Sequence, residues 1–68
     1  MRPVRLQEVE PGQRYLFTFR RPVLAGSRKR TLVATVGAAF WGEVPLEIGR
    51  GRVIRVERSD VLRALHVA

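Results

Sequence analysis

The chain has 68 residues and a formal net charge of +7, from 13 lysines and arginines against six aspartates and glutamates. This length is about half of a typical domain, and it excludes a multi-domain enzyme, a Rossmann fold or a repeat array. Because the chain has no cysteine, stability must come from a compact core, from oligomerisation or from both. We therefore expect one small domain over residues 1–68.

All of the basic residues except Lys29 are arginines. Such a charge favours an anionic partner, namely nucleic acid, an acidic protein surface or anionic lipid. The planar guanidinium suits phosphate, but GC-rich codon usage or a requirement for solubility gives the same composition. The N-terminal residues 1–11 carry four charges, unlike a signal peptide, and the longest uncharged run has twelve residues, Thr31 to Gly42. A membrane span needs about 20 apolar residues, so we expect a cytoplasmic protein without membrane association.

The first half of the chain predicts a turn, a strand and a loop. Residues 4–9 are a short apolar lead-in, either a strand or one helical turn, and Pro11-Gly12 predicts the turn that follows. Residues 14–20 alternate with period two, which is typical of a half-buried strand. The aromatic residues that share its inner face are Tyr15, Phe17 and Phe19. Proline, glycine and serine within residues 21–30 then indicate a mobile loop or a hairpin with a basic tip.

The second half predicts three further strands and a closing segment. Residues 32–40 alternate, with Gly37 at a bulge or bend. Residues 44–48 predict a strand in which Pro45 marks a start, a bulge or an edge. The last elements are a tight hairpin at residues 49–51, a strand at 52–58, a stop at Ser59-Asp60, one helical turn at 61–65 and a closing strand at 65–67. We therefore expect an all-β fold of about five short strands, with at most a short helical or 3-10 turn near the C-terminus. Closing such a sheet into a small barrel removes its edges.

Over residues 10–67 this pattern resembles the small SH3-like and Sm-like barrels. The features that carry the resemblance are the Pro11-Gly12 entry, the bent strand through Gly37, the hairpin at 49–51, and residues 59–62, which are similar to the 3-10 turn before the last strand of such barrels. Residues 51–56 are also similar to the Gly-x-Val stretch of KOW-type barrels. The resemblance implies a five-stranded barrel. It concerns architecture, because a chain without asparagine lacks the Sm-type RNA signature.

The sequence favours binding over catalysis. Ser59, Asp60 and His66 have the residue types of a catalytic triad, but no nucleophile-elbow motif surrounds the serine. Glu43 and Glu47 fall on one strand face, as expected for solvated side chains. We expect no enzymatic activity, no metal and no cofactor.

The basic residues are segregated along the chain. Residues 1–30 carry eight basic and two acidic side chains, whereas residues 31–49 carry two glutamates and no basic residue. Residues 50–58 are basic again. If the two basic loops meet at one end of a barrel, they form a rim suited to phosphates. The candidate phosphate contacts are Arg20, Arg21, Arg28, Lys29, Arg30, Arg50 and Arg52.

Phe40 and Trp41 are neighbours, so a strand points them to opposite faces. Phe40 continues the apolar face, which leaves Trp41 as the candidate for stacking a base, with a lid over the barrel end as the alternative. The first hypothesis is therefore a nucleic-acid-binding module that contacts backbone phosphates. The alternative is a protein-interaction or oligomer-forming barrel, in which residues 44–48 provide an unprotected edge and the chain forms a homo-oligomer.

Overall fold

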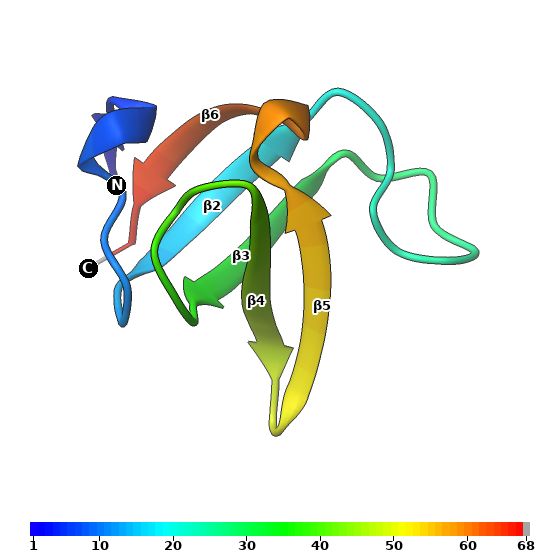
Figure 1. Cartoon of the computed structure of the whole chain (residues 1–68). Coiled ribbons are helices and arrows are strands. Elements are labelled where there is room, and N and C mark those ends of the chain that lie inside the picture. The colour runs from blue at the N-terminus through cyan, green and yellow to red at the C-terminus, as the bar shows by residue number, and fades with distance from the viewer. Residues whose placement is uncertain (68) are drawn as a thin grey trace.

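Alternation of apolar and polar side chains produces six strands and two 3-10 turns in the computed structural model, which describes residues 1–67 (Figure 1). In chain order the elements are β1 (Arg2–Val4), η1 (Leu6–Glu8), β2 (Arg14–Phe19), β3 (Thr31–Val36), β4 (Glu43–Gly49), β5 (Arg52–Glu57), η2 (Arg58–Asp60) and β6 (Val61–His66). The prediction of an all-β fold is confirmed. None of the helical turns among these residues is long and apolar enough to cross a membrane.

The strands form one antiparallel sheet in the order β1-β6-β2-β3-β4-β5. The last strand therefore lies between the first two: β6 places His66 opposite Arg2 of β1 and also opposite Tyr15 of β2. The sheet has six strands rather than five because residues 2–4 form β1, a strand that the pattern did not predict. The apolar lead-in predicted at residues 4–9 contains only the last residue of β1 and continues as the single turn η1. Among residues 1–67 no ladder joins the outer strands β1 and β5, so hydrogen bonding does not close the sheet.

The core is built on the inner face of β2, as the alternation predicts. Phe17 is fully buried and its ring stacks on Phe40 at a centroid distance of 5.7 Å and an interplanar angle of 11°. Tyr15 is also buried, and its hydroxyl oxygen accepts a hydrogen bond from the backbone N–H of Glu10 at 3.0 Å. The buried residues of the core are Val9, Tyr15, Phe17, Phe19, Ala34, Val36, Val44, Leu46, Val56, Val61 and Ala64.

β3 is shorter than predicted, ending at Val36 rather than at Phe40. The next residue, Gly37, donates its backbone N–H to the Pro45 carbonyl oxygen at 2.9 Å. A Cβ on Gly37 would lie 3.4 Å from that proline's Cγ and from its carbonyl oxygen. The chain then leaves the sheet, since residues 38–42 belong to no strand.

The prediction that residues 44–48 form an exposed edge is wrong, because β4 lies between β3 and β5. Pro45 is nevertheless tolerated inside the sheet. A residue in an antiparallel strand directs its N–H and its C=O to the same side. The Pro45 carbonyl faces Gly37, so the Pro45 nitrogen also faces Gly37, one residue past the end of the β3–β4 ladder at Val36. The lack of an N–H at Pro45 therefore removes no bond from that ladder.

The predicted hairpin and stop are confirmed. β4 and β5 are joined through Arg50 and Gly51, and Gly51 has a positive φ of 68°. η2 follows β5 as a single 3-10 turn. The helical turn predicted at residues 61–65 is wrong, because these residues pair with β1 and β2 as part of the closing strand. That strand, β6, is longer than predicted and begins at Val61, immediately after η2.

Candidate nucleic-acid interface

The two basic loops lie at different places on the molecule (Figure 1). The β2–β3 loop, residues 20–30, extends beyond one end of β2 at the right of the view, whereas the β4–β5 hairpin projects at the bottom. This separation arises because β4 pairs with β3 at only two positions, Thr35 opposite Glu47 and Val36 opposite Leu46, and the hairpin then turns away. The loops therefore do not form one shared rim.

The basic tip of the β2–β3 loop is formed by Arg28, Lys29 and Arg30, all of which are exposed. Arg50 lies in the hairpin turn and Arg52 begins β5, and both are exposed as well. Within residues 1–67 the only ion pairs are those of Arg21 and Arg55. None of the five side chains at the tip and the hairpin is therefore occupied by an internal carboxylate.

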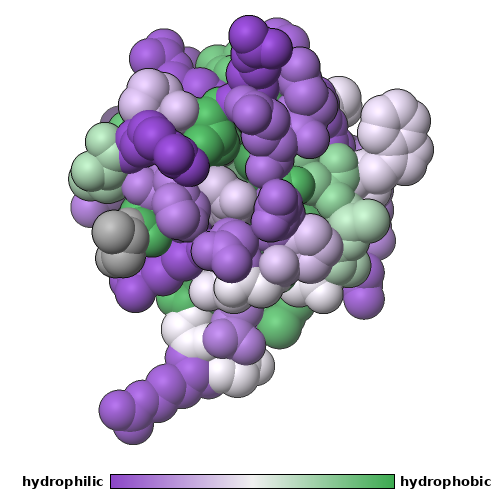
Figure 2. Space-filling model, turned by 90° about the vertical axis from the view of Figure 1, so that its left-hand side faces the viewer, coloured by the Kyte–Doolittle hydropathy of each residue, from purple (hydrophilic) through white to green (hydrophobic). Residues whose placement is uncertain are grey.

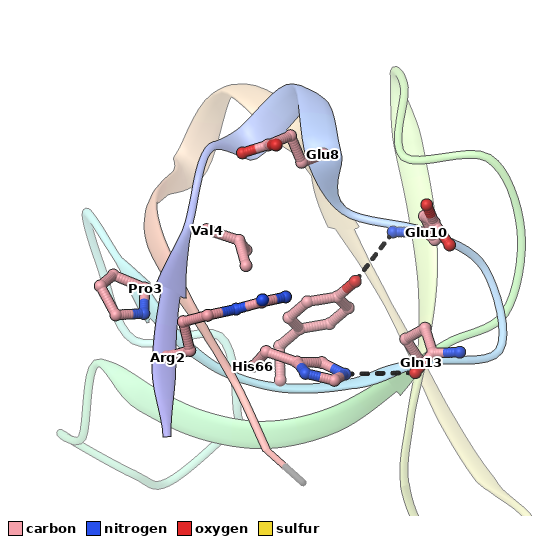
Figure 3. A pocket seen from close by; sticks show the side chains of 8 residues that line it. Arg2, Pro3, Val4, Glu8, Glu10, Gln13 and His66 are labelled. Atoms are coloured by element: carbon pink, nitrogen blue, oxygen red, sulfur yellow. Dashed lines mark hydrogen bonds between the residues drawn. The ribbon is translucent and has the colours of Figure 1, made fainter.

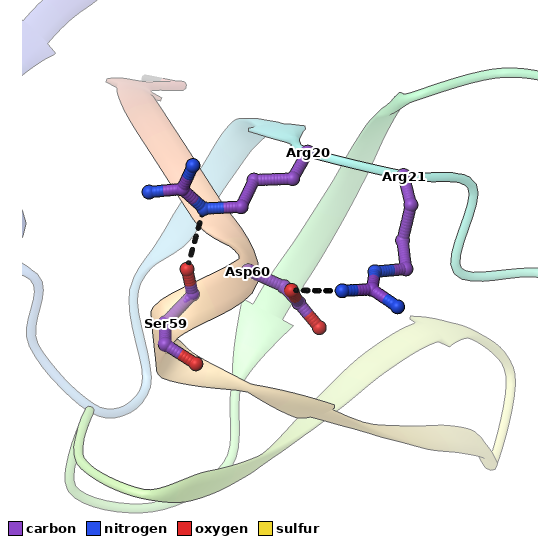
Figure 4. A network of polar contacts seen from close by, with 4 residues as sticks. All are labelled: Arg20, Arg21, Ser59 and Asp60. Atoms are coloured by element: carbon purple, nitrogen blue, oxygen red, sulfur yellow. Dashed lines mark hydrogen bonds and ion pairs between the residues drawn. The ribbon is translucent and has the colours of Figure 1, made fainter.

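Arg20 and Arg21 start the same loop but are held against η2 (Figure 4). The Arg20 Nε donates to the Ser59 carbonyl oxygen at 2.9 Å, and the Arg20 backbone N–H donates to the Asp60 carbonyl oxygen at 2.8 Å. An Arg21 Nη lies 3.4 Å from an Asp60 carboxylate oxygen. These contacts use one N–H of the Arg20 guanidinium, so its remaining donors are available for an anion.

Trp41 has 82% of its surface exposed, which does not fit a lid over a core. It lines a shallow recess together with Gly42, Glu57, Arg58 and Ser59. The loop before β4 reaches this recess because the Arg58 backbone N–H donates to the Gly42 carbonyl oxygen at 2.7 Å. The structure thus places the exposed indole beside Arg58, which is not among the candidate contacts predicted from the sequence.

Ser59 connects these two groups of residues. It lines the recess beside Trp41, and its carbonyl oxygen accepts the bond from Arg20. We name the surface formed by Arg20, Arg21, Trp41, Arg58 and Ser59 the η2 surface. Its acidic neighbours are Glu57, which lines the recess, and Asp60, which pairs with Arg21.

The surface on the side of β1 and η1 is mainly hydrophilic, and the β4–β5 hairpin projects below it (Figure 2). A second pocket of about 440 Å³ is lined by β1, η1 and the end of β6 (Figure 3). In it the His66 Nε2 lies 3.2 Å from the Gln13 Oε1, and the His66 ring lies 5.3 Å from that of Tyr15. The lining residues are Arg2, Pro3, Val4, Glu8, Glu10, Gln13, Tyr15 and His66.

The position of His66 in this pocket separates it from Ser59 and Asp60, the other two residues of the candidate catalytic triad. Ser59 and Asp60 precede β6, whereas His66 ends it. Six strand residues span roughly 20 Å, so the three side chains do not assemble. Among residues 1–67 there is also no cluster of three or more histidine, aspartate or glutamate side chains arranged to hold a metal ion.

No family profile, curated protein or solved structure matches the chain.

Proposed function

We propose that the protein is a small, non-enzymatic binding module that binds nucleic acid through its backbone phosphates and stacks a base on Trp41. The observation that carries the proposal is the 82% exposure of this indole beside Arg58. Proteins that bind single strands combine exposed aromatic side chains with a cationic surface, and each stacked base contributes about 1–3 kcal/mol. Arg20 donates a hydrogen bond to the carbonyl oxygen of Ser59, which lines this recess, and would supply a further cation.

The basic tip extends this surface along the chain. Arg28, Lys29 and Arg30 belong to the loop whose first residues, Arg20 and Arg21, bind η2. A strand that contacts the η2 surface would meet the loop next. Arg50 and Arg52 lie on the separate hairpin and would meet a longer strand or the second strand of a duplex.

The test uses the only tryptophan of the chain as a reporter. Oligo(dT) is titrated into the protein while the emission of Trp41 is followed, at several salt concentrations. Stacking should quench the emission. If three to four phosphates are neutralised, log affinity should fall with log salt at a slope of roughly −2 to −3, about a 30-fold loss between 50 and 200 mM salt. Absence of salt-sensitive binding to single-stranded and duplex DNA or RNA at low salt would overturn the proposal.

Arg58→Ala and Arg5→Ala provide a matched pair for this titration. Each variant removes one guanidinium, from the half-buried Arg58 of the η2 surface or from the exposed Arg5. Arg5 lies between β1 and η1, away from the η2 surface, and its side chain makes no cap hydrogen bond. We expect Arg58→Ala to weaken oligo(dT) binding several-fold more than Arg5→Ala. Equal losses would mean that net charge alone drives the binding.

We further propose that β2 to β6 form an SH3-like barrel. The support is the strand order β6-β2-β3-β4-β5 and the 3-10 turn between β5 and β6. η2 also bonds at one end to the loop before β4 and at the other to the residue after β2, through Gly42 and Arg20. An experimental structure in which β5 shared no core with β2 would contradict this assignment.

A protein-interaction role is the second candidate, favoured by the open outer edge of β5. Val53 on this strand is 53% exposed, and no ladder occupies the edge within residues 1–67. Pairing of two such edges would give a homo-oligomer. Light scattering at high protein concentration tests it, and a clean 7.7 kDa monomer would remove it.

A further inference from the structure

In β3, every second residue forms backbone hydrogen bonds with β2. Phe19 donates to the Arg30 carbonyl at 2.7 Å, and Val36 donates to the Gln13 carbonyl at 3.0 Å. Since hydrogen-bonded and non-bonded pairs alternate in an antiparallel ladder, the even-numbered residues of β3 face β2. Thr31, Val33 and Thr35 direct their N–H and C=O groups to the opposite side.

Within the described residues 1–67, only Thr35 of these three has a partner strand on that side. Thr35 lies opposite Glu47 of β4, and the ladder stops at that pair. The same register would place Val33 opposite Gly49, but β4 shifts register between Glu47 and Gly49, and the hairpin turns away. Thr31 and Val33 thus present backbone donors and acceptors on an open edge, and both residues are exposed.

A groove opens where the two strands part. It has a volume of about 630 Å³, with β3 as one wall and the end of β4 as the other. Arg14 and Arg50 border it, and neither makes an ion pair within residues 1–67. The lining residues are Arg14, Val33, Ala34, Thr35, Glu47, Ile48, Gly49 and Arg50.

We propose that this groove binds an extended acidic peptide of another protein, which adds a strand to the free edge of β3. Only a polypeptide offers N–H and C=O groups at the alternating spacing that Thr31 and Val33 require. The exposed side chain of Val33 and the half-buried Ile48 provide apolar contacts for alternate residues of the guest strand.

Charge decides which kind of peptide fits. Arg14 and Arg50 border the groove, and the basic tip leads directly into Thr31, so carboxylates on the guest are favoured. Glu47 is the only acidic residue of the lining. A second copy of the chain fits poorly, because its outer strand β5 carries Arg52 and Arg55 and each copy has a net charge of +7.

The test is an NMR titration of the isotope-labelled protein with a blocked heptapeptide of alternating valine and aspartate. The amide resonances of Thr31 and Val33 should shift downfield, while Trp41 and the η2 surface remain unchanged. A peptide in which lysine replaces aspartate should bind at least tenfold more weakly. Shifts confined to other surfaces, or equal binding of both peptides, would overturn the proposal.

Val33→Pro and Val53→Pro form a matched pair of variants. Each proline removes one N–H from an open edge: in the β4–β5 ladder the Arg58 N–H faces Gly42, so odd-numbered residues of β5 point outward. We expect Val33→Pro to lose at least tenfold in affinity and Val53→Pro to bind as the wild type does. Equal affinities of the two variants would contradict strand addition at β3.

A modified peptide keeps the test independent of protein folding. N-methylation of the guest at alternate residues blocks one of its two edges, so one of the two possible methylation patterns should lose binding at least tenfold and the other should not. Equal binding of both patterns would overturn the proposal. If oligo(dT) shifts Thr31 and Val33 and the acidic peptide does not, the groove belongs to nucleic acid and the proposal fails, whereas quenching of Trp41 tests the proposed function separately.

Discussion

The guanidinium carbon of Arg58 lies 5.7 Å from the centre of the Phe40 ring. Phe40 in turn stacks on the fully buried Phe17. The Arg58 side chain therefore links η2 to the aromatic core and also lines the recess beside Trp41. Cation–π contacts of this kind contribute about 0.5–1 kcal/mol at exposed sites and more where they are desolvated.

Replacing Arg58 with methionine should destabilise the fold, because an apolar chain of similar length keeps the packing but loses the charge above Phe40. We expect a loss of about 0.5–1 kcal/mol, which lowers the Tm of a domain of this size by about 2–8 °C. Calorimetry measures the change. Arg55→Met is the control, since Arg55 makes only an exposed ion pair with Glu43 at 3.7 Å. A smaller effect at Arg58 than at Arg55 would count against the contact.

Trp41→Ala should separate binding from stability. The side chain is 82% exposed, so its removal should change the free energy of unfolding by no more than about 0.5 kcal/mol. Affinity for oligo(dT), followed by anisotropy of a labelled oligonucleotide, should fall by about 1–3 kcal/mol without a change of salt slope. A lowered melting temperature with unchanged affinity per folded molecule would instead identify Trp41 as a structural residue.

Replacing Arg28, Lys29 and Arg30 together with alanine should weaken binding of all sequences alike. These side chains are exposed on a loop, so the fold should be retained. Each lost phosphate contact reduces the magnitude of the single-strand salt slope by about 0.7, and three lost contacts reduce it by about 2. Titrations at four salt concentrations measure the slope. An unchanged slope would show that the tip does not touch the strand.

Gly51→Ala should destabilise the β4–β5 hairpin, whereas Gly49→Ala should not. A Cβ at either position meets no atom within 4 Å, but only Gly51 has a positive φ, 68°. An alanine in this conformation costs about 1–2 kcal/mol. Urea unfolding of the two variants measures the difference, and equal midpoints would contradict the assigned turn.

Local pattern was sufficient for the strands whose two faces differ. The alternation through Tyr15, Phe17 and Phe19 predicted a buried face, and all three side chains are buried. The glycines of residues 49–51 also predicted the hairpin that turns at Arg50 and Gly51, because the backbone there needs a residue that accepts a positive φ.

The tertiary arrangement of the strands could not be predicted from these local patterns. The alternation through residue 40 could not reveal that Gly37 meets Pro45, which ends β3 early. The pattern of residues 44–48 is the same for an edge and for an inner strand. Arg58 was missed as part of the candidate site because its neighbourhood with Trp41 depends on a backbone bond to Gly42, sixteen positions away.

The place of β6 in the sheet bears on how the chain folds during synthesis. Among residues 1–67, β1 pairs with β6 alone, and β6 covers one of the two edges of β2. Ribosomes add about 5–20 residues per second, so β2 to β5 are complete a few seconds or less before β6 is made. Over that interval β1 has no partner and one edge of β2 is open. The domain therefore reaches its final sheet only after residue 66 has left the ribosome, in one late step that joins both ends of the described chain.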